Sequence, residues 1–340
     1  MKVTIKDVAK AAGVSPSTVS RALHHNPRIS AEVSARIQRI AAEMDFHPNP
    51  MASSLVSRQS RIVGIVFPGD AGRSMGGHPF YPAVLQGLGH AASERRYHML
   101  LSTGSEAAET ADTIRQLVDS GYVSGLIVLA AEDNPEEETR LPVVVIGRAK
   151  NGAAIGSVDN DNVAAGRAAT RYLLERGHRR ILLLGCDERL MVTAERRRGY
   201  EQALEEAGIP FRAEWMISGS FLHQNFAADV LDGVFCGEQR PTAVVSMDDA
   251  LAIGLMGFLG GMGLSVPGDV SVVSFNNTDA GRYHTPALTS IDVNPYRLGT
   301  EAMALMLDLI EGKAEAPVRL ETPFTLIERG SVAIFPITQP

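Results

Sequence analysis

No run of apolar residues in this 340-residue sequence approaches the ~18 that a membrane-spanning helix needs, which excludes an integral membrane protein. The first residues, MKVTIKDVAKAAG, carry lysines and an aspartate without a continuous apolar stretch, so they do not predict a secretory signal. With 45% hydrophobic and 21% charged residues, the composition is that of a globular chain. We therefore expect a cytoplasmic protein with no membrane contact.

Cysteine is scarce: Cys186 and Cys236 each stand in an apolar stretch, and neither has a CxxC partner. This spacing argues against a disulfide framework and against zinc, and we expect both thiols to be buried. Catalytic motifs are missing as well, because the sequence has no Walker loop, GxGxxG after a strand, GxSxG, HExxH or usefully spaced Cys/His pair. We expect no enzyme, no catalytic residue, no metal and no cofactor.

The net charge of −7 hides a split along the chain. Residues 1–61 hold nine Lys and Arg against four Asp and Glu, a balance of +5, whereas residues 62–340 hold 23 against 35, a balance of −12. A basic head on an acidic body predicts that only the head meets a polyanion. The length favours a small module followed by a large two-lobed body.

The head begins with a predicted helix over residues 4–12, whose apolar residues recur at helical spacing. They are Ile5, Val8, Ala9 and Ala12. Thr4 and Asp7 have the spacing of a capping box at its start.

A second helix is predicted to begin at Pro16, after Ser15 as its cap, and to run to about Leu23. Its outward positions are Ser17, Thr18, Ser20 and Arg21. Short hydroxyls suit phosphates and a guanidinium suits a guanine edge, so this pattern is typical of a recognition helix. A third helix, capped by Ser30 and ending near Met44, closes the small core.

The segment TIKDVAKAAGVSPSTVSRALHHNPRIS resembles the N-terminal signature of the LacI/GalR repressor family along its whole length. The alternative, which two short helices alone leave open, is a helical hairpin that only decorates the body. The resemblance implies binding to operator DNA. The DNA-binding residues that we predict are Thr4, Ser15, Pro16, Ser17, Thr18, Ser20, Arg21, Arg28, Asn49, Ala52 and Leu55.

Residues 46–61, FHPNPMASSLVSRQSR, continue the resemblance into a hinge. Asn49 can cap a short helix, which alone in water is mostly unfolded. In the family this helix folds against its dimer mate and inserts a leucine wedge into the minor groove; Leu55 is the matching residue, beside Asn49 and Ala52. Ser53 stands where the family often has Arg, which puts one minor-groove contact in doubt. A plain solvated linker is the alternative.

From Ile62 onward, short β-rich runs alternate with helical patterns, which predicts an α/β body made of βαβ units. The expected strands are Ile62 to Phe67, His98 to Leu101, Gly125 to Leu129, Val143 to Ile146, Ile181 to Leu184, Ala243 to Ser246 and Val270 to Phe275. This number implies two sheets. The resemblance implies two doubly wound parallel-sheet lobes of the periplasmic-binding-protein type, with crossovers near Asp161, Ser290 and Pro317. We assign residues 1–48 to the helix-turn-helix domain, 49–61 to the hinge and 62–340 to an effector-binding and dimerisation domain.

Polar and aromatic residues follow the predicted strands, at the edge where ligands bind in such folds. Carboxylate, amide and guanidinium groups beside aromatic rings suit a polyol, and in the family the Arg of R-x-x-G-Y, here Arg196, points at ligand hydroxyls. The predicted effector-binding residues are Phe80, Tyr81, Arg148, Asp161, Thr193, Arg196, Phe221, Asp248 and Asn276. Taken singly, the aromatic residues could be core residues, and Asp161 or Asp248 could only cap the following helix.

The resemblance implies a homodimer that represses a carbohydrate operon from a palindromic operator and responds to a small sugar. Within the family, FPGDAGRSMGGHPFYPAVLQGLGH, LLSTG, MVTAERRRGYEQAL and FNN are most similar to maltose-operon repressors, which implies maltose or a maltodextrin. One alternative is a catabolite-control regulator with a phosphorylated carrier protein as corepressor. The other is a transport-type sugar-binding protein, for which the basic head has no use.

Overall fold

The computed structural model describes residues 3–23, 26, 28–46, 60–67, 79–103, 107–129, 139–148, 155–185, 190–218, 228–237 and 239–335. The chain divides into two compact units, Met1–Ser60 and Arg61–Pro340, here called the head and the body. Among the described residues, no helix combines the length and the apolar character that crossing a bilayer requires.

The head is built from α1 (Ile5–Ala12), α2 (Pro16–Leu23) and α3 (Ala31–Glu43). The caps expected for these three helices are present. The Thr4 backbone N–H donates to the Asp7 carboxylate at 2.9 Å, Ser15 Oγ accepts from the Thr18 backbone N–H at 3.2 Å, and Ser30 Oγ accepts from the Val33 backbone N–H at 3.4 Å. The three helices close over a small core of Val8, Ala9, Ala12, Val19, Ala22, Ile37 and Ala41.

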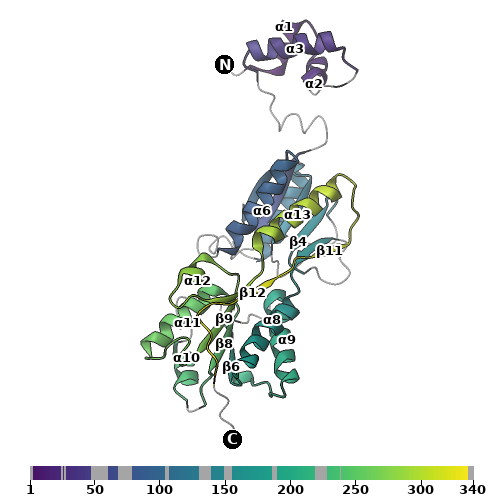
Figure 1. The fold of residues 1–340 in the computed structure, drawn as a ribbon. Coiled ribbons are helices and arrows are strands. Elements are labelled where there is room, and N and C mark those ends of the chain that lie inside the picture. The colour runs from purple at the N-terminus through teal and green to yellow at the C-terminus, as the bar shows by residue number, and fades with distance from the viewer. Residues whose placement is uncertain are drawn as a thin grey trace. The chain divides into compact units, whose positions relative to one another are not determined.

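The first lobe of the body holds a parallel sheet of order β11-β5-β4-β3-β1-β2. Its strands are β1 (Ile62–Phe67), β2 (His98–Thr103), β3 (Gly125–Leu129), β4 (Val143–Ile146), β5 (Gly156–Asp159) and β11 (Val318–Glu321). Its helices are α6 (Phe80–Glu94), α7 (Ala107–Ser120) and α13 (Pro295–Ile310), and α6 and α13 lie side by side (Figure 1).

The second lobe holds a sheet of order β12-β10-β9-β8-β6-β7, which is parallel except that β12 runs antiparallel to β10. Its strands are β6 (Ile181–Leu184), β7 (Met216–Ile217), β8 (Ala243–Ser246), β9 (Ser271–Phe275), β10 (Thr289–Asp292) and β12 (Thr325–Ile327). Its helices are α8 (Asn162–Glu175), α9 (Met191–Glu206), the 3₁₀ turn η1 (Ala213–Trp215), α10 (Ala228–Phe235), α11 (Asp249–Gly261) and α12 (Asp279–Tyr283) (Figure 1).

The chain passes between the lobes at residues 160–161, 293–294 and 322–324. The third crossing differs from the expectation near Pro317, because Pro317 precedes β11 and β11 still belongs to the first sheet. Strand β11 is half exposed and half polar, so its sequence resembles a loop.

Asn160 joins the three crossings. Its buried side-chain amide donates to the backbone oxygens of Val293 at 3.1 Å and Thr322 at 2.8 Å. One side chain in the first crossing thus hydrogen-bonds to the second and to the third.

Two details of the body depart from the sequence prediction. Cys236 is exposed and not buried, because it lies just after the end of α10. The sequence also favours a strand from Glu214 to Ser218, before Phe221, but the structure reduces it to β7, since residues 213–215 form the 3₁₀ turn η1. Cys186 lies outside the described residues.

Each lobe contains one very close pair of helices, and glycine allows both. A Cβ on Gly87 of α6 would lie 2.0 Å from the Tyr296 backbone oxygen of α13. In the second lobe, a Cβ on Gly199 of α9 would lie 2.0 Å from the Val163 backbone oxygen of α8. These separations are far below any real carbon contact, so the two helix pairs depend on residues without a side chain.

We expect Gly87→Ala to lower the free energy of unfolding by about 1–3 kcal/mol, because the new methyl group must push α13 away. Urea denaturation measures this. The matched control is Gly233→Ala in α10, where a Cβ meets nothing within 4 Å. It should raise the free energy of unfolding by about 0.5–1 kcal/mol, through the helix propensity of alanine. Equal stability of the two variants would contradict the close packing of α6 on α13.

Candidate DNA-binding and effector sites

The outer surface of α2 carries a cluster of hydroxyls and a guanidinium. Ser15 Oγ lies 2.7 Å from Ser17 Oγ and 2.9 Å from Thr18 Oγ1, and Ser17 and Arg21 are exposed. Pro16 is exposed at the start of the helix, and Ser20 is half-buried. Hydroxyls that can donate to phosphate thus stand on the same short helix as an exposed guanidinium, a group that suits a guanine edge.

Side-chain hydrogen bonds from α3 reach both α2 and α1. Ser34 Oγ of α3 donates to the Ala22 backbone oxygen at 3.1 Å, and Arg36 of α3 donates to the Ala12 backbone oxygen at 3.3 Å. The Thr4 hydroxyl and backbone N–H donate to Asp7 and hold the pKa of that carboxyl below its usual value. The exposed Arg28 lies in the turn before α3. The predicted hinge contacts Asn49, Ala52 and Leu55 lie outside the described residues.

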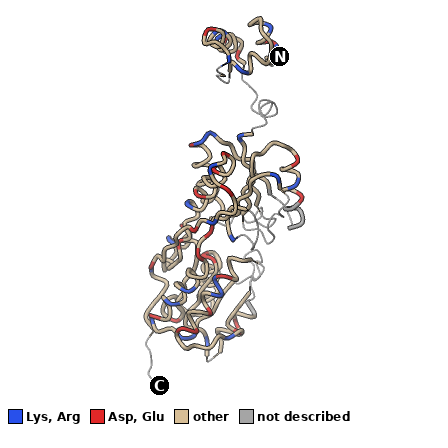
Figure 2. Tube along the Cα trace, turned by 90° about the vertical axis from the view of Figure 1, so that its right-hand side faces the viewer, with Lys and Arg blue, Asp and Glu red and all other residues tan. Residues whose placement is uncertain are grey.

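Acidic and basic residues are interspersed along the body (Figure 2). In the body the strand order places the predicted effector residues, apart from Phe221, on facing edges of the two sheets. The chain enters α8 of the second lobe directly after the carboxyl end of β5, and it enters α13 of the first lobe directly after the carboxyl end of β10. The carboxyl edge of each sheet therefore adjoins the other lobe, which is where ligands bind in doubly wound folds.

Arg196 of α9 is buried and held on three sides. Its Nε donates to Asn162 Oδ1 and its Nη1 donates to the Met247 backbone oxygen, both at 3.1 Å. Its guanidinium carbon lies 4.1 Å from the centre of the Phe275 ring. Burial lowers the pKa of Arg196 to about 10, against the pull of Asp159 and Asp248, so the side chain stays charged at neutral pH. These contacts fix the plane of a charged donor at the strand ends.

Asp248 and Asn276 lie together beside this arginine. The Asn276 side-chain amide donates to Asp248 at 2.6 Å, and the same carboxylate accepts from the Ala250 backbone N–H at 2.7 Å. Asp248 therefore caps α11 and also belongs to the polar cluster. Asp161 caps α8 by accepting from the Ala164 backbone N–H at 2.9 Å. The Thr193 hydroxyl donates to the Leu190 backbone oxygen at 3.0 Å.

The aromatic residues expected to stack on a sugar ring lie at the start of α6. Phe80 and Tyr81 meet edge to face at 5.5 Å between ring centres, and Tyr81 also meets Phe67 at 5.8 Å. Both are half-buried, and Phe80 packs against the apolar cores of both lobes. Phe221 lies outside the described residues.

Arg148 was predicted to donate to ligand hydroxyls, and in the structure it forms an ion pair with Glu195 of α9. Gly147, with a φ of 125°, provides the turn that separates Arg148 from β4. Glu195 is buried, whereas about one third of the Arg148 side chain is exposed. This ion pair joins the first lobe to the second.

Three polar residues at the strand ends were missed in the sequence. Asp159, Asn162 and Glu195 are buried, and the Asn162 side chain donates to Asp159 at 3.1 Å while accepting from Arg196. Burial raises the pKa of Asp159, and hydrogen bonds from Asn160 and Asn162 oppose that rise. The run DNDN, which begins at the last residue of β5, was the available signal for Asp159 and Asn162, since buried polar groups need hydrogen-bond partners.

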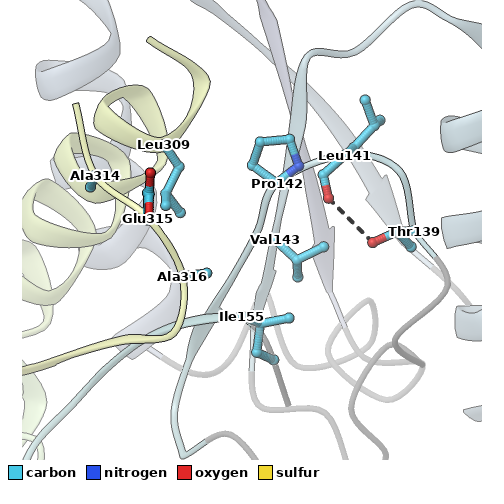
Figure 3. A pocket seen from close by; sticks show the side chains of 9 residues that line it. All are labelled: Thr139, Leu141, Pro142, Val143, Ile155, Leu309, Ala314, Glu315 and Ala316. Atoms are coloured by element: carbon cyan, nitrogen blue, oxygen red, sulfur yellow. Dashed lines mark hydrogen bonds between the residues drawn. The ribbon is translucent and has the colours of Figure 1, made fainter. Parts of the chain in front are cut away.

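A hollow of about 300 Å³ lies away from this set, at the opposite edge of the first sheet. Val143 begins β4 there, and Ile155 precedes β5, so the hollow adjoins the amino ends of the strands (Figure 3). It is lined by Thr139, Leu141, Pro142, Val143, Ile155, Leu309, Ala314, Glu315 and Ala316. None of the predicted effector residues contributes to it.

Within the described residues, His, Cys, Asp and Glu form no group placed to bind a metal ion.

Two family models match the chain. The model of bacterial regulatory proteins of the lacI family matches residues 4–49, and the model of the periplasmic binding protein-like domain matches residues 170–332. The chain is 34% identical to the HTH-type transcriptional regulator MalR of Streptococcus pneumoniae, over 91% of this chain and 93% of that protein. It is 31% identical to the HTH-type transcriptional repressor PurR of Erwinia tasmaniensis, over 97% of each protein.

Solved structures show the same architecture. The transcriptional regulator CelR in complex with cellobiose superposes with a TM-score of 0.74 at 27% identity, over 97% of this chain and all of that one. The lac repressor dimer bound to operator and the anti-inducer ONPF superposes with a TM-score of 0.83 over 98% of this chain and all of that one, and at 23% identity it supports the fold alone. These relatives are regulators of transcription and not enzymes. The chain therefore belongs to the LacI family of bacterial regulatory proteins, with a helix-turn-helix head and a body of two periplasmic-binding-protein-like lobes.

Proposed function

We propose that this protein is a homodimeric repressor of a carbohydrate-utilisation operon, which acts in the cytoplasm and is released from a palindromic operator by maltose or a maltodextrin. The observation that carries the proposal is the fixed guanidinium of Arg196 at the facing strand ends, beside Asp248 and Asn276. This combination of charged donor, carboxylate and amide suits the hydroxyl groups of a sugar.

The DNA-binding half of the proposal rests on the head. Ser17, Thr18, Ser20 and Arg21 share α2, and the basic balance of residues 1–61 suits a polyanion. Two heads related by a two-fold axis would read two half-sites of a palindrome, which is why we propose a homodimer.

The choice of maltose rests on the similarity to maltose-operon repressors, and MalR is among the relatives that the chain matches over almost its full length. CelR, with a similar fold, is in complex with cellobiose. A ligand of this size can contact both lobes at once, because Phe80 and Tyr81 come from the first lobe and Arg196, Asp248 and Asn276 from the second.

The mechanism follows from the three crossings. A sugar that binds one relative orientation of the lobes more tightly than another shifts the population toward it, by as much as the two affinities differ. This shift changes operator binding if the affinity of the protein for operator DNA also differs between the two lobe orientations. Such couplings between two binding sites are typically about 1–3 kcal/mol.

We expect Arg21→Ala to weaken operator binding by about 1–3 kcal/mol and to relax the preference at one base pair of each half-site, because a base-reading guanidinium is lost. Binding to a set of singly substituted operators measures this. Lys10→Ala, which removes an exposed charge from α1, should weaken all these operators alike. An unchanged base preference in the Arg21 variant would show that another residue reads that position.

We expect Arg196→Met to bind operator normally in the absence of sugar and to need at least tenfold more maltose for release, roughly the loss of one charge-assisted hydrogen bond. Methionine keeps most of the volume, so the body can remain packed. Arg197→Met is the control, because Arg197 pairs with Glu201 on the same helix at 2.8 Å. Normal release of a folded Arg196 variant by maltose would refute the proposed sugar site.

The identity of the sugar has its own test. Calorimetric titration of the full-length protein with maltose, maltotriose, sucrose and trehalose should give binding for the first two only. If only sucrose or trehalose binds, the proposal of a sugar-responsive repressor stands, but maltose is not its effector. Operator binding that no sugar changes would favour the catabolite-control alternative.

A further inference from the structure

The ion pair between Arg148 and Glu195 differs from the other ion pairs described in the body. Arg148 follows β4 in the first lobe, and Glu195 lies on α9 in the second, so the pair spans the two lobes. By contrast, Arg197 and Glu201 form a pair within α9, and Arg297 and Glu301 form one within α13. A contact that spans two lobes depends on their relative orientation, whereas a contact within one helix does not.

Burial makes this contact energetically significant. Glu195 is only 5% exposed, and an uncompensated carboxylate at that depth is costly. Any movement that separates the lobes at this point must leave Glu195 without its cation or bring water to it. The orientation seen here is therefore favoured by the pair.

The position of Glu195 connects this contact to the sugar site. It precedes Arg196 on α9, and the backbone of Arg196 is packed closely on α8, since a Cβ on Gly166 would lie 2.1 Å from the Arg196 backbone oxygen. A displacement of α9 relative to Arg148 would therefore move the neighbouring guanidinium as well.

We propose that Arg148 and Glu195 form an interlobe latch, which stabilises one relative orientation of the lobes and so sets the balance between operator binding and sugar binding. This inference rests on the proposed function and adds the regulation of its site. Arg148 acts on the ligand through the lobe orientation, so it is a positioning residue here and not the hydroxyl donor that its place in the sequence suggested.

Linkage gives the latch a signature that does not depend on which orientation it favours. If operator and sugar prefer different orientations, weakening the latch must change the two affinities in opposite directions. A residue that only touches the sugar changes the sugar affinity and leaves the sugar-free operator affinity alone.

The test uses the full-length protein with both partners neutralised, Arg148→Gln together with Glu195→Gln, so that no buried charge is stranded. The charge-swapped protein, Arg148→Glu together with Glu195→Arg, is the second variant. The matched control is Arg197→Gln together with Glu201→Gln, which removes the same charges one turn further along α9. The measurements are operator affinity without sugar, maltose affinity, and hydrogen exchange at the backbone amides of Asn160 and Thr322 in the crossings.

We expect the neutral pair to change the operator and maltose affinities in opposite directions, each by roughly fivefold or more, and to speed exchange at the crossings. The charge swap should return the values toward wild type, and the control should match wild type. A change in maltose affinity alone would overturn the latch in favour of a direct sugar contact, and no difference from the control pair would also overturn it.

Failure of the proposed function gives a different result. If wild-type protein ignores both operator and maltose, the function is wrong, and hydrogen exchange alone then decides the latch. Faster exchange at both crossings in the neutral pair supports the latch, and unchanged exchange refutes it.

Discussion

Two hydrogen bonds from one side-chain amide hold together the place where the lobes meet. Asn160 donates to the backbone oxygens of Val293 and Thr322, so its side chain binds both other crossings. If the three crossings moved independently, the lobes would have no defined axis of rotation relative to each other. Because hydrogen bonds join the crossings, these three segments move together when one lobe turns on the other. A side-chain amide buried to this extent needs hydrogen-bond partners. The bonds that satisfy Asn160 therefore also fix the three interlobe crossings relative to one another.

The polar network continues from this point to the candidate sugar site. The neighbouring Asp159 accepts from the Asn160 backbone N–H and from the Asn162 side chain, and Asn162 accepts from Arg196. Each member is buried, and each gains from the next the hydrogen bonds that water would otherwise supply. The residue that we propose to bind the sugar is thus connected to the crossings by side chains that cannot rearrange separately.

The sequence predicted the head and most of the sheets because those features are local. Caps such as Ser15 and Ser30 and buried strands such as Val143–Ile146 have short, strong patterns, and the structure places them as expected. Four strands were missed, and their patterns are weak. β5 (GSVD) and β10 (TSID) are buried yet largely polar, β11 is half exposed, and β12 has only three residues. These segments are strands because they pair with neighbouring strands, and that pairing cannot be read from the local sequence pattern.

For the candidate site, too, the sequence indicated some features and not others. Arg196 has a recognisable spacing to Gly199 and Tyr200, and its burial among polar groups agrees with a functional interpretation. The partner of Arg148 could not be found, because Glu195 lies 47 positions away on another lobe and only the fold brings them together. Long-range ion pairs leave no periodic signal.

The pair of Asp248 and Asn276 shows how one amide can alter what such a site reads. Both Asn276 and Asn277 have positive φ, 94° and 47°, a backbone region that asparagine adopts more readily than most residues. The Asn276 amide donates to Asp248 at 2.6 Å, and an aspartate at position 276 would set two carboxylates against each other and raise the pKa of one. With asparagine, the Asp248 carboxylate receives an N–H donor instead, and the amide oxygen remains as a neutral acceptor. The proposed sugar site therefore holds two acceptors of different strength, a carboxylate and an amide oxygen.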